Sequence, residues 1–202
     1  MEKPQNRKRQ EKKYIISNSE ATKLEKHIIT QGFYINHQSN VINNVYLDDQ
    51  ECSSMNENIN GDEVRSKHRI RWYENENQFV LEEKIKQSSS GSKKKRPLVA
   101  KDLNEAVHMA CTITKKNPVI QNSYNRRYFI NGKTRITIDR NLRFELPLTG
   151  SWKNFDNVIV EVKYDTSDVL NSRSFLIREM QLTKFSKFLE GLKAFGRIPI
   201  SE

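Results

Sequence analysis

Arginine, lysine and tyrosine recur at every second position in several segments of this chain, which is the spacing of side chains on one face of a β-strand. In the segment HRIRWYENENQFVLEEKIK, residues 68–86, Arg69, Arg71 and Tyr73 alternate with apolar residues. Arginine presents a planar fork of N–H donors that matches the oxygens of a phosphate group. This spacing therefore fits either the solvated outside of a sheet or a strand face that binds a polyanion.

The same alternation of polar and aliphatic residues is present in at least five strand-like segments. The polar positions beyond the first segment are Glu82, Lys84 and Lys86; Tyr124, Arg126 and Tyr128; Arg135, Thr137 and Asp139; and Glu161 and Lys163. One interpretation is an open sheet whose charged side faces water. The other is a closed barrel with a charged lumen, whose aliphatic outside is covered by helices and which has no unpaired edge strand.

The elements that must position these residues are mostly consecutive strands with few helices, which predicts an α+β domain with an antiparallel sheet. Strands are expected over residues 13–17, 41–48, 64–74, 78–86, 119–130, 134–139, 142–146 and 157–164, with an edge strand at 93–99 because Pro97 cannot donate to a neighbouring strand. Helices are expected over residues 20–31, 101–116, 170–180 and 183–195, and a polar loop over 49–63. Asp48 and Asp49 in YLDD fit either metal ligands or a turn at the end of a strand, and the turn is favoured.

The composition indicates the kind of partner and the cellular compartment to expect. The chain has 202 residues, a net charge of +10 and a pI of about 9.6, so an anionic partner is expected: nucleic acid, polyphosphate, nucleotide or acidic lipid. The two cysteines lack metal-binding spacing, which favours a reduced, cytoplasmic setting. No long apolar run and no secretory signal is present, so no membrane span is expected. Residues 1–10 are predicted to be a flexible basic tail, and residues 11–202 one domain that needs no disulfide.

Six short motifs occur in this chain in the order seen in VTC domains: RIRWY, LEEKIK, YNRRYF, RITIDRNL, VIVEVKY and TKFSKFLEG. The chain resembles this family from about residue 9 to residue 192. VTC domains are the polyphosphate polymerase members of the triphosphate tunnel metalloenzymes. The resemblance implies a closed eight-stranded antiparallel β-barrel with flanking helices, whose basic tunnel holds triphosphate and a growing phosphate chain.

The resemblance also implies an activity and the residues that carry it. The known eukaryotic members transfer the γ-phosphate of ATP to polyphosphate with a divalent metal, Mn²⁺ or Mg²⁺. The implied phosphate-binding residues are Lys13, Arg69, Arg71, Lys84, Lys94, Tyr124, Arg126 and Arg135, and the implied catalytic residues are Lys184, Ser186 and Lys187 of KFSKF. The run KKKR also allows the Lys94 assignment to shift by one position. Glu161 matches the metal-binding glutamate, and Glu82 is either a second metal ligand or a structural partner of Lys84.

The first strand separates the subfamilies of tunnel enzymes. Hydrolytic members usually begin with an ExExK strand whose glutamates hold metal. Here the same positions are Arg9, Glu11 and Lys13, so a cation replaces one carboxylate. This difference argues against triphosphate hydrolysis and for a metal-dependent ATP:polyphosphate phosphotransferase.

Two alternatives stay open beside the hypothesis of a polymerase-like function. The first is a tunnel-fold triphosphatase that hydrolyses tripolyphosphate or nucleoside triphosphates. The second is a non-catalytic module that binds polyanions or nucleic acid, although the chain has no recognisable RNA- or DNA-binding motif and nucleic acid is disfavoured. The regulatory SPX domain and the membrane segments of the eukaryotic family members are not found in this sequence, so a separate membrane protein is a candidate partner.

Overall fold

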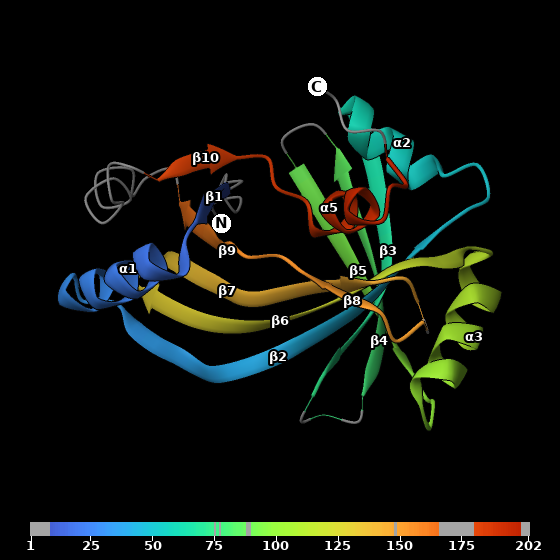
Figure 1. Ribbon diagram of the computed structural model, residues 1–202, viewed down its shortest axis with the longest axis horizontal. Helices are drawn as coiled ribbons and strands as arrows, with labels where there is room; N and C mark the ends of the chain where they lie inside the picture. The colour runs from blue at the N-terminus through green and yellow to red at the C-terminus, as the bar shows by residue number, and fades with distance from the viewer. Residues whose placement is uncertain are drawn as a thin grey trace, which may run out of the picture. The chain divides into compact units, whose positions relative to one another are not determined.

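The computed structural model of the chain describes residues 9–74, 76, 78–87, 90–147, 149–165 and 180–198. The strands are β1 (Arg9–Ile16), β2 (Tyr34–Asp48), β3 (Val64–Tyr73), β4 (Phe79–Gln87), β5 (Ser90–Leu98), β6 (Asn117–Asn131), β7 (Thr134–Glu145), β8 (Trp152–Asn154), β9 (Val158–Asp165) and β10 (Gln181–Thr183). The helices are α1 (Asn18–Thr30), α2 (Ser53–Asn60), α3 (Leu103–Thr114) and α5 (Lys187–Ala194). These elements confirm the predicted α+β class (Figure 1).

The strands form an antiparallel sheet whose order is β10-β1-β9-β7-β6-β2-β3-β4-β5, with β8 paired to β7. Over the described ranges this sheet has ten strands and is not closed, since no pairing joins β5 to β10. The predicted closed eight-stranded barrel is therefore not confirmed. The edge strand β5 carries Pro97, which has no N–H to donate, and a run of cations, both of which discourage further pairing.

The chain divides into two compact units. The first unit comprises Met1–Asn40, Asn125–Leu142 and Asp156–Phe185, and the second comprises Val41–Tyr124, Arg143–Phe155 and Ser186–Glu202. Strands β2, β6 and β7 contribute residues to both units. None of the helices in the described ranges has the length and apolar character that crossing a membrane requires.

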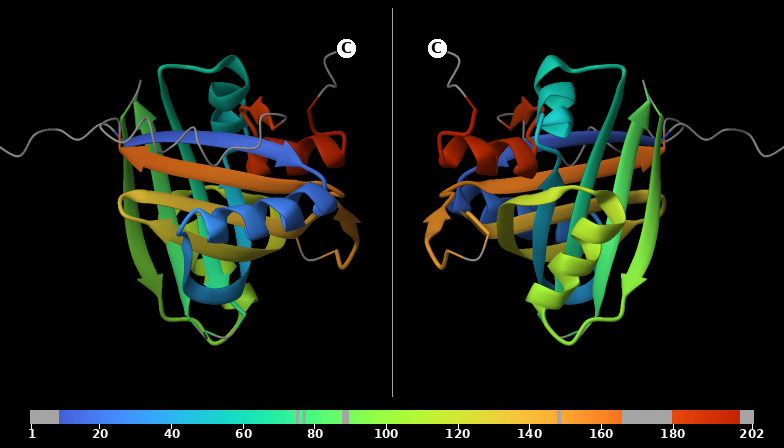
Figure 2. Two further views of the ribbon diagram at one scale, coloured as in Figure 1. Left: turned by 90° about the vertical axis from the view of Figure 1, so that its left-hand side faces the viewer. Right: turned by 90° about the vertical axis from the view of Figure 1, so that its right-hand side faces the viewer.

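In the first unit, helix α1 covers the aliphatic face of the strands (Figure 2). Its buried residues Ala21, Leu24 and Ile28 join a core with the aliphatic positions of β7 and β9. The helix begins with a capping box, in which the Ser17 hydroxyl accepts from the Glu20 N–H and the Glu20 carboxylate accepts from the Ser17 N–H. The sequence analysis placed this helix correctly and began it two residues later than the structure does.

In the second unit, helix α3 covers the aliphatic face of β2, β3, β4 and β5. Its Ala106, Val107 and Ala110 are buried in one cluster that includes Ile70 and Leu81. The predicted covering of an aliphatic face by helices is thus confirmed in each unit. The polar residues that alternate with these aliphatic ones must consequently lie on the opposite face of their strands.

Helix α5 packs against β6 and β7 of the second unit through a glycine. A Cβ atom at Gly191 would lie 2.7 Å from Ile120 Cγ1 and 2.8 Å from Phe144 Cδ1, distances that real Cβ contacts do not reach. The absence of a side chain therefore lets the helix backbone approach these strands closely. The flanking buried residues Phe188 and Leu192 fill the remaining space beside the glycine.

The structure differs from the sequence prediction in several elements. Helix α2 lies in the predicted polar loop, and β10 precedes a final helix that is shorter than expected. Residues 134–145 form one strand instead of two, because β7 continues through Asn141 although this residue has a φ of 53°. The helix predicted over 170–180 falls on residues that, apart from Met180, lie outside the described part of the chain. Strand β1 begins at Arg9, within the predicted tail.

Substitution of Gly191 by alanine tests the packing of α5. An alanine in an exposed helix position usually stabilises a protein by up to about 1 kcal/mol relative to glycine. Here we expect the opposite sign, a loss of about 1–3 kcal/mol in the free energy of unfolding, because the new methyl group overpacks the contact with Ile120 and Phe144. Urea denaturation of Gly191→Ala and of the exposed control Lys193→Ala measures the difference. Stabilisation by Gly191→Ala would contradict the close approach.

Candidate functional site

A buried carboxylate surrounded by cations is the centre of the polar face in the second unit. The Glu82 side chain is 3% exposed, and its Oε2 accepts from Arg69 Nε at 2.8 Å. Lys93 Nζ pairs with the other carboxylate oxygen, and Arg71 Nε lies 3.9 Å from Oε2. Burial alone would raise the pKa of Glu82, but the charges of Arg69 and Arg71 and the hydrogen bonds outweigh it and lower the pKa to about 2.

The strand register extends this cluster into a basic face. Arg69 is opposite Glu82 on β3 and β4, and Lys95 is opposite Glu82 on β5. Two residues further along β4, Lys84 is opposite Lys67 of β3 and Lys93 of β5. Because directly opposed residues point to the same side of a sheet, these side chains share one face. We call it the basic face, and it consists of Lys67, Arg69, Arg71, Lys84, Lys93 and Lys95 around Glu82.

Polar residues of β2 and β6 hold Arg71 in place. Its Nε donates to Asn44 Oδ1 at 2.8 Å, and its Nη2 donates to the Tyr124 hydroxyl at 3.2 Å. The Asn44 amide in turn donates to Asn122 Oδ1 at 2.8 Å. On the other side of the phenol ring, Lys187 Nζ lies 4.5 Å from the Tyr124 ring centroid. The predicted residues Arg71, Tyr124 and Lys187 are therefore brought together.

The N-terminus of α5 joins the same face. Ser186 caps the helix by accepting from the Leu189 N–H, and its hydroxyl accepts from Lys67 Nζ at 2.9 Å. Lys187 is the first residue of the helix. Of the three residues implied as catalytic, Ser186 and Lys187 thus lie beside the basic face, whereas Lys184 is exposed in the first unit.

The first unit carries a second polar cluster on β1 and β9. Lys163 Nζ lies 2.7 Å from Glu161 Oε1 and 3.3 Å from Glu11 Oε2, and Lys13 Nζ lies 3.3 Å from the other oxygen of Glu11. Lys13 is opposite Glu161 in the register and also donates to the Phe185 carbonyl at 3.2 Å. Burial acts to raise the pKa of Glu161, but the neighbouring cations, Lys163 first, hold it well below its usual range.

Two more predicted residues lie on β6 and β7 of the first unit. Arg126 makes a bidentate ion pair with Asp139, with Nε–Oδ1 and Nη2–Oδ2 distances of 2.6 and 2.7 Å. Its guanidinium also lies 5.9 Å from the Tyr128 ring centroid. Arg135 is exposed and opposite Lys163 in the register. Asp139, which sequence analysis noted only as part of an alternating face, is the direct partner of Arg126.

Some charged side chains of both clusters are partly shielded from water, whereas Lys84 and Lys95 are exposed and the Lys93 side chain is 35% exposed. Arg69, Arg71, Arg126 and Glu161 have side chains that are 19%, 11%, 15% and 15% exposed, respectively. A charged face that simply meets bulk water leaves its long side chains largely exposed. These four side chains are therefore less exposed than those of an ordinary solvated surface. The partly buried arginines pair with carboxylates, Arg69 with Glu82 and Arg126 with Asp139.

Lys93 is a site residue that the sequence analysis did not select. Lys94 is opposite Glu83, pairs with it at 3.5 Å, and has a side chain that is 75% exposed. Lys93 lies one residue away on the basic face and pairs with Glu82. Burial, the largest influence, lowers the pKa of Lys93 to about 8. The signal that selects it is the β4–β5 register, because Lys93 and Lys95 alternate in phase with Lys84 and Glu82.

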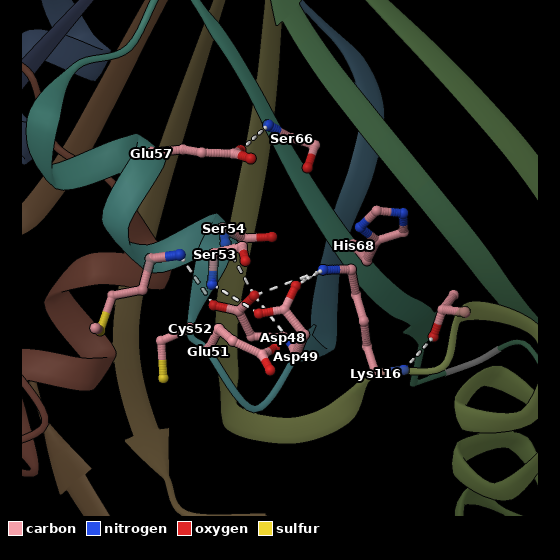
Figure 3. A network of polar contacts seen from close by, with 12 residues as sticks. Asp48, Asp49, Glu51, Cys52, Ser53, Ser54, Glu57, Ser66, His68 and Lys116 are labelled. Atoms are coloured by element: carbon pink, nitrogen blue, oxygen red, sulfur yellow. Dashed lines mark hydrogen bonds and ion pairs between the residues drawn. The ribbon is translucent and has the colours of Figure 1, made fainter.

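The carboxylates of YLDD form a different network, at the start of α2 (Figure 3). Asp48 is 1% exposed and accepts from the N–H groups of Ser54 and Met55, while Asp49 accepts from Ser53 N–H and pairs with Lys116 Nζ at 2.8 Å. Cys52 precedes the helix with a φ of 55° and makes no side-chain cap. These two aspartates therefore cap α2 from outside the helix, which agrees with the favoured turn interpretation.

The described residues contain no group of three or more histidine, cysteine or acidic side chains arranged to hold a metal ion. Glu82 binds cationic side chains with both oxygens, those of Arg69 and Lys93, so its geometry fits a structural partner of cations. Glu161 and Glu11 instead flank one ammonium group, that of Lys163. Two carboxylates together with phosphate oxygens are a usual ligand set for Mg²⁺. A metal shared with a phosphate ligand therefore fits the first unit.

Comparison with known proteins assigns the family. The profile of the VTC domain matches residues 8–117 and 99–195, so the chain belongs to the VTC domain family. No curated protein sequence matches the chain significantly. Its motifs in RIRWY, YNRRYF and KFSKF had indicated the same family.

Solved structures share the fold at low sequence identity. The PH1819 protein of Pyrococcus horikoshii OT3 has a TM-score of 0.59 at 10% identity, with 92% of this chain and 99% of that one covered. A proposed adenylate cyclase from Vibrio parahaemolyticus has a TM-score of 0.55 at 14% identity, with 84% of each chain covered. A proposed adenylyl cyclase from Hippeastrum, described as having a dominant triphosphatase activity, has a TM-score of 0.53 at 12% identity, with 94% and 96% covered. The chain thus shares the fold of these proteins.

The lowered pKa of Lys93 predicts that the affinity of the basic face for phosphate depends on pH. We expect the affinity for inorganic tripolyphosphate to fall by about tenfold as pH rises from 7 to 9, because Lys93 loses its charge near pH 8 and a charge-assisted hydrogen bond is lost with it. Arginine stays protonated over this range. Lys93→Arg should therefore remove most of the fall, and Lys94→Arg should retain it.

Isothermal titration calorimetry at pH 7, 8 and 9 measures these affinities. Comparing each variant with wild type at the same pH cancels the titration of the ligand itself. If Lys94→Arg removes the fall and Lys93→Arg does not, the phosphate contact belongs to Lys94, as the sequence analysis first assigned it.

Proposed function

We propose that this chain is a metal-dependent ATP:polyphosphate phosphotransferase that moves the γ-phosphate of ATP onto a growing polyphosphate chain. The observation that carries the proposal is the basic face of the second unit, where cations gather around the buried Glu82 beside Ser186 and Lys187. Membership of the VTC domain family supports a substrate with a triphosphate group. The two cysteines are free thiols, which supports a reducing, cytoplasmic setting.

The chemistry needs positioning and charge neutralisation more than covalent help from the protein. In this proposal Arg69 and Arg71 bind oxygens of the phosphate chain, and Glu82 and Asn44 keep their guanidinium groups oriented. Lys187 neutralises the charge that develops on the bridging oxygen during transfer. A general base is not required, because the acceptor phosphate is already ionised.

A divalent metal, Mn²⁺ or Mg²⁺, supplies Lewis-acid neutralisation of phosphate oxygens when it is bound. Glu161 is the proposed protein ligand, with Glu11 beside it across Lys163. The same two carboxylates also favour the second candidate function, a triphosphatase, since Glu11 keeps one acidic position of the hydrolytic ExExK strand. The dominant triphosphatase activity named for the Hippeastrum protein belongs to a chain of the same fold.

Incubation of the purified protein with ATP and Mn²⁺ separates the two functions. A phosphotransferase produces long polyphosphate that is visible on a gel and that a polyphosphate-specific exopolyphosphatase removes. A triphosphatase releases inorganic phosphate from ATP or tripolyphosphate without a long product. Binding of tripolyphosphate with neither product would favour the non-catalytic polyanion-binding module.

Glu161→Gln should abolish metal-dependent turnover and retain anion binding. The change removes the carboxylate charge that holds the metal and leaves the cations of both units in place. Turnover with Mn²⁺ and the dissociation constant for tripolyphosphate without metal are the two measurements. The control is Glu83→Gln, a carboxylate that pairs with Lys94 and His68 on the opposite face of β4. Unchanged Mn²⁺-dependent turnover in Glu161→Gln would rule out this metal ligand.

Arg71→Ala and Lys187→Ala should lower activity through different kinetic parameters, KM and kcat respectively. Arg71 binds phosphate in the ground and transition states alike, so its loss should chiefly raise KM. Lys187 acts on charge that develops during transfer, so its loss should lower kcat by about 100-fold with a smaller change in KM. Steady-state kinetics with ATP and Mn²⁺ test both, with folding checked by circular dichroism and Lys193→Ala as the control in α5. A wild-type kcat in Lys187→Ala would show that α5 has a structural role and no catalytic one.

A further inference from the structure

Two fully buried asparagines lie in line behind Arg71 in the second unit. Asn44 on β2 and Asn122 on β6 are both 0% exposed, and the Asn44 amide nitrogen donates to Asn122 Oδ1 at 2.8 Å. Asn44 Oδ1 accepts from Arg71 Nε at 2.8 Å. Buried amides are costly unless they are hydrogen-bonded, so this line of contacts needs an explanation.

The arginine determines which way both amides point. A guanidinium is a donor only, so the group of Asn44 that faces Arg71 must be its carbonyl oxygen. The Asn44 nitrogen is then directed to Asn122, and the Asn122 oxygen must face Asn44 to accept from it. The orientation of three side chains from three strands is thus fixed as one unit.

This arrangement leaves the Asn122 nitrogen pointing away from Asn44. Among the described residues, Asn122 Nδ2 is buried and has no hydrogen-bond partner. An unsatisfied buried donor costs on the order of 1–3 kcal/mol, and an apolar pair at these positions would avoid that cost. A role limited to filling the core therefore does not account for the pair. Its one connection to the basic face is the Arg71 guanidinium.

Arg71 itself is held from two sides. Besides the Asn44 contact, its Nη2 donates to the Tyr124 hydroxyl at 3.2 Å, and the side chain is 11% exposed. Two of the five N–H donors of the guanidinium are thereby engaged, and the planar group cannot rotate without breaking both bonds. The remaining donors are consequently presented in one direction. Orienting a donor before the ligand arrives avoids the cost of ordering it on binding.

We propose that Asn44 and Asn122 are positioning residues that set the direction of the Arg71 guanidinium for an oxygen of the phosphate chain. The inference rests on the proposed function for the identity of the ligand. It does not rest on it for the state of Arg71 in the free protein, which can be measured directly.

The first measurement follows the Arg71 Nε–H proton by ¹H–¹⁵N NMR without ligand, with the signal assigned by its loss in Arg71→Lys. In wild type we expect slow exchange with water, because this proton is bonded to Asn44. Asn122→Leu removes the acceptor of the Asn44 amide, and we expect exchange of the Arg71 proton to become about tenfold faster or more, the change that corresponds to 1.4 kcal/mol. Asn122→Ser, which shortens the side chain, is the second variant should Asn122→Leu not fold. The matched control is Gln121→Leu, a buried neighbour on the opposite face of β6.

The second measurement is tripolyphosphate affinity in a double-mutant cycle. We expect Asn122→Leu to weaken binding about tenfold in the wild-type background and to have less than about a twofold effect in Arg71→Ala, because the asparagine acts through the arginine. An equal loss in both backgrounds, or unchanged Arg71 Nε–H exchange in both Asn122 variants, overturns the inference. Failure of wild type to bind tripolyphosphate, or wild-type binding by Arg71→Ala, would instead overturn the proposed function, and the exchange measurement would still decide the positioning role.

Discussion

Cations held close together under partial burial are the constraint on which the polar half of this structure depends. Each guanidinium or ammonium that leaves water loses hydration, and its neighbours of like charge repel it. The structure meets this cost with single carboxylates placed among the cations. Glu82 forms ion pairs with Arg69 and Lys93, and Asp139 accepts two short hydrogen bonds from Arg126. The depressed pKa of Glu82 and the depressed pKa of Lys93 are two consequences of this crowding.

The same constraint explains why the basic face suits an anionic ligand. Several cations of this face surround the single carboxylate of Glu82, which gives this side of the strands a positive charge. A phosphate chain brings several negative charges and many acceptor oxygens into that field, and its binding stabilises the folded chain by mass action. The pairing of Lys13 and Lys163 with Glu11 and Glu161 gives the first unit a cluster in which cations and carboxylates are more evenly balanced.

The aliphatic faces make this arrangement stable. Helix α1 in the first unit and helix α3 in the second bury the apolar side chains that alternate with the charged ones. Burial of this kind contributes roughly 25 cal/mol per Å² of apolar surface, whereas the charged faces contribute little or oppose folding. The strands under these helices therefore have an aliphatic face that stabilises the fold and an opposite face that carries the charged side chains.

The sequence by itself determined the features that depend on local periodicity. Alternation with a period of two separated Arg69 and Arg71 from Ile70, predicted the strands that carry them, and indicated the VTC domain family that the comparison confirmed. Helices α1 and α3 followed from their apolar spacing, whereas their capping residues Ser17 and Asp102 were not predicted. These features could be read because they involve residues a few positions apart, where backbone geometry fixes which side chains share a face.

Only the tertiary structure decided the features that depend on pairing between distant segments. The β4–β5 register chose Lys93 over Lys94, since a shift of one residue moves a side chain to the opposite face. The sequence of helix α2 indicates a helix only weakly, because its capping residues lie outside it. Asp48 at the end of β2 and Asp49 directly after it supply these caps. The line from Arg71 through Asn44 to Asn122 joins three strands, and the open order of the sheet replaced the predicted closed barrel. None of these contacts leaves a periodic trace in the sequence, because each is set by where the folded strands meet.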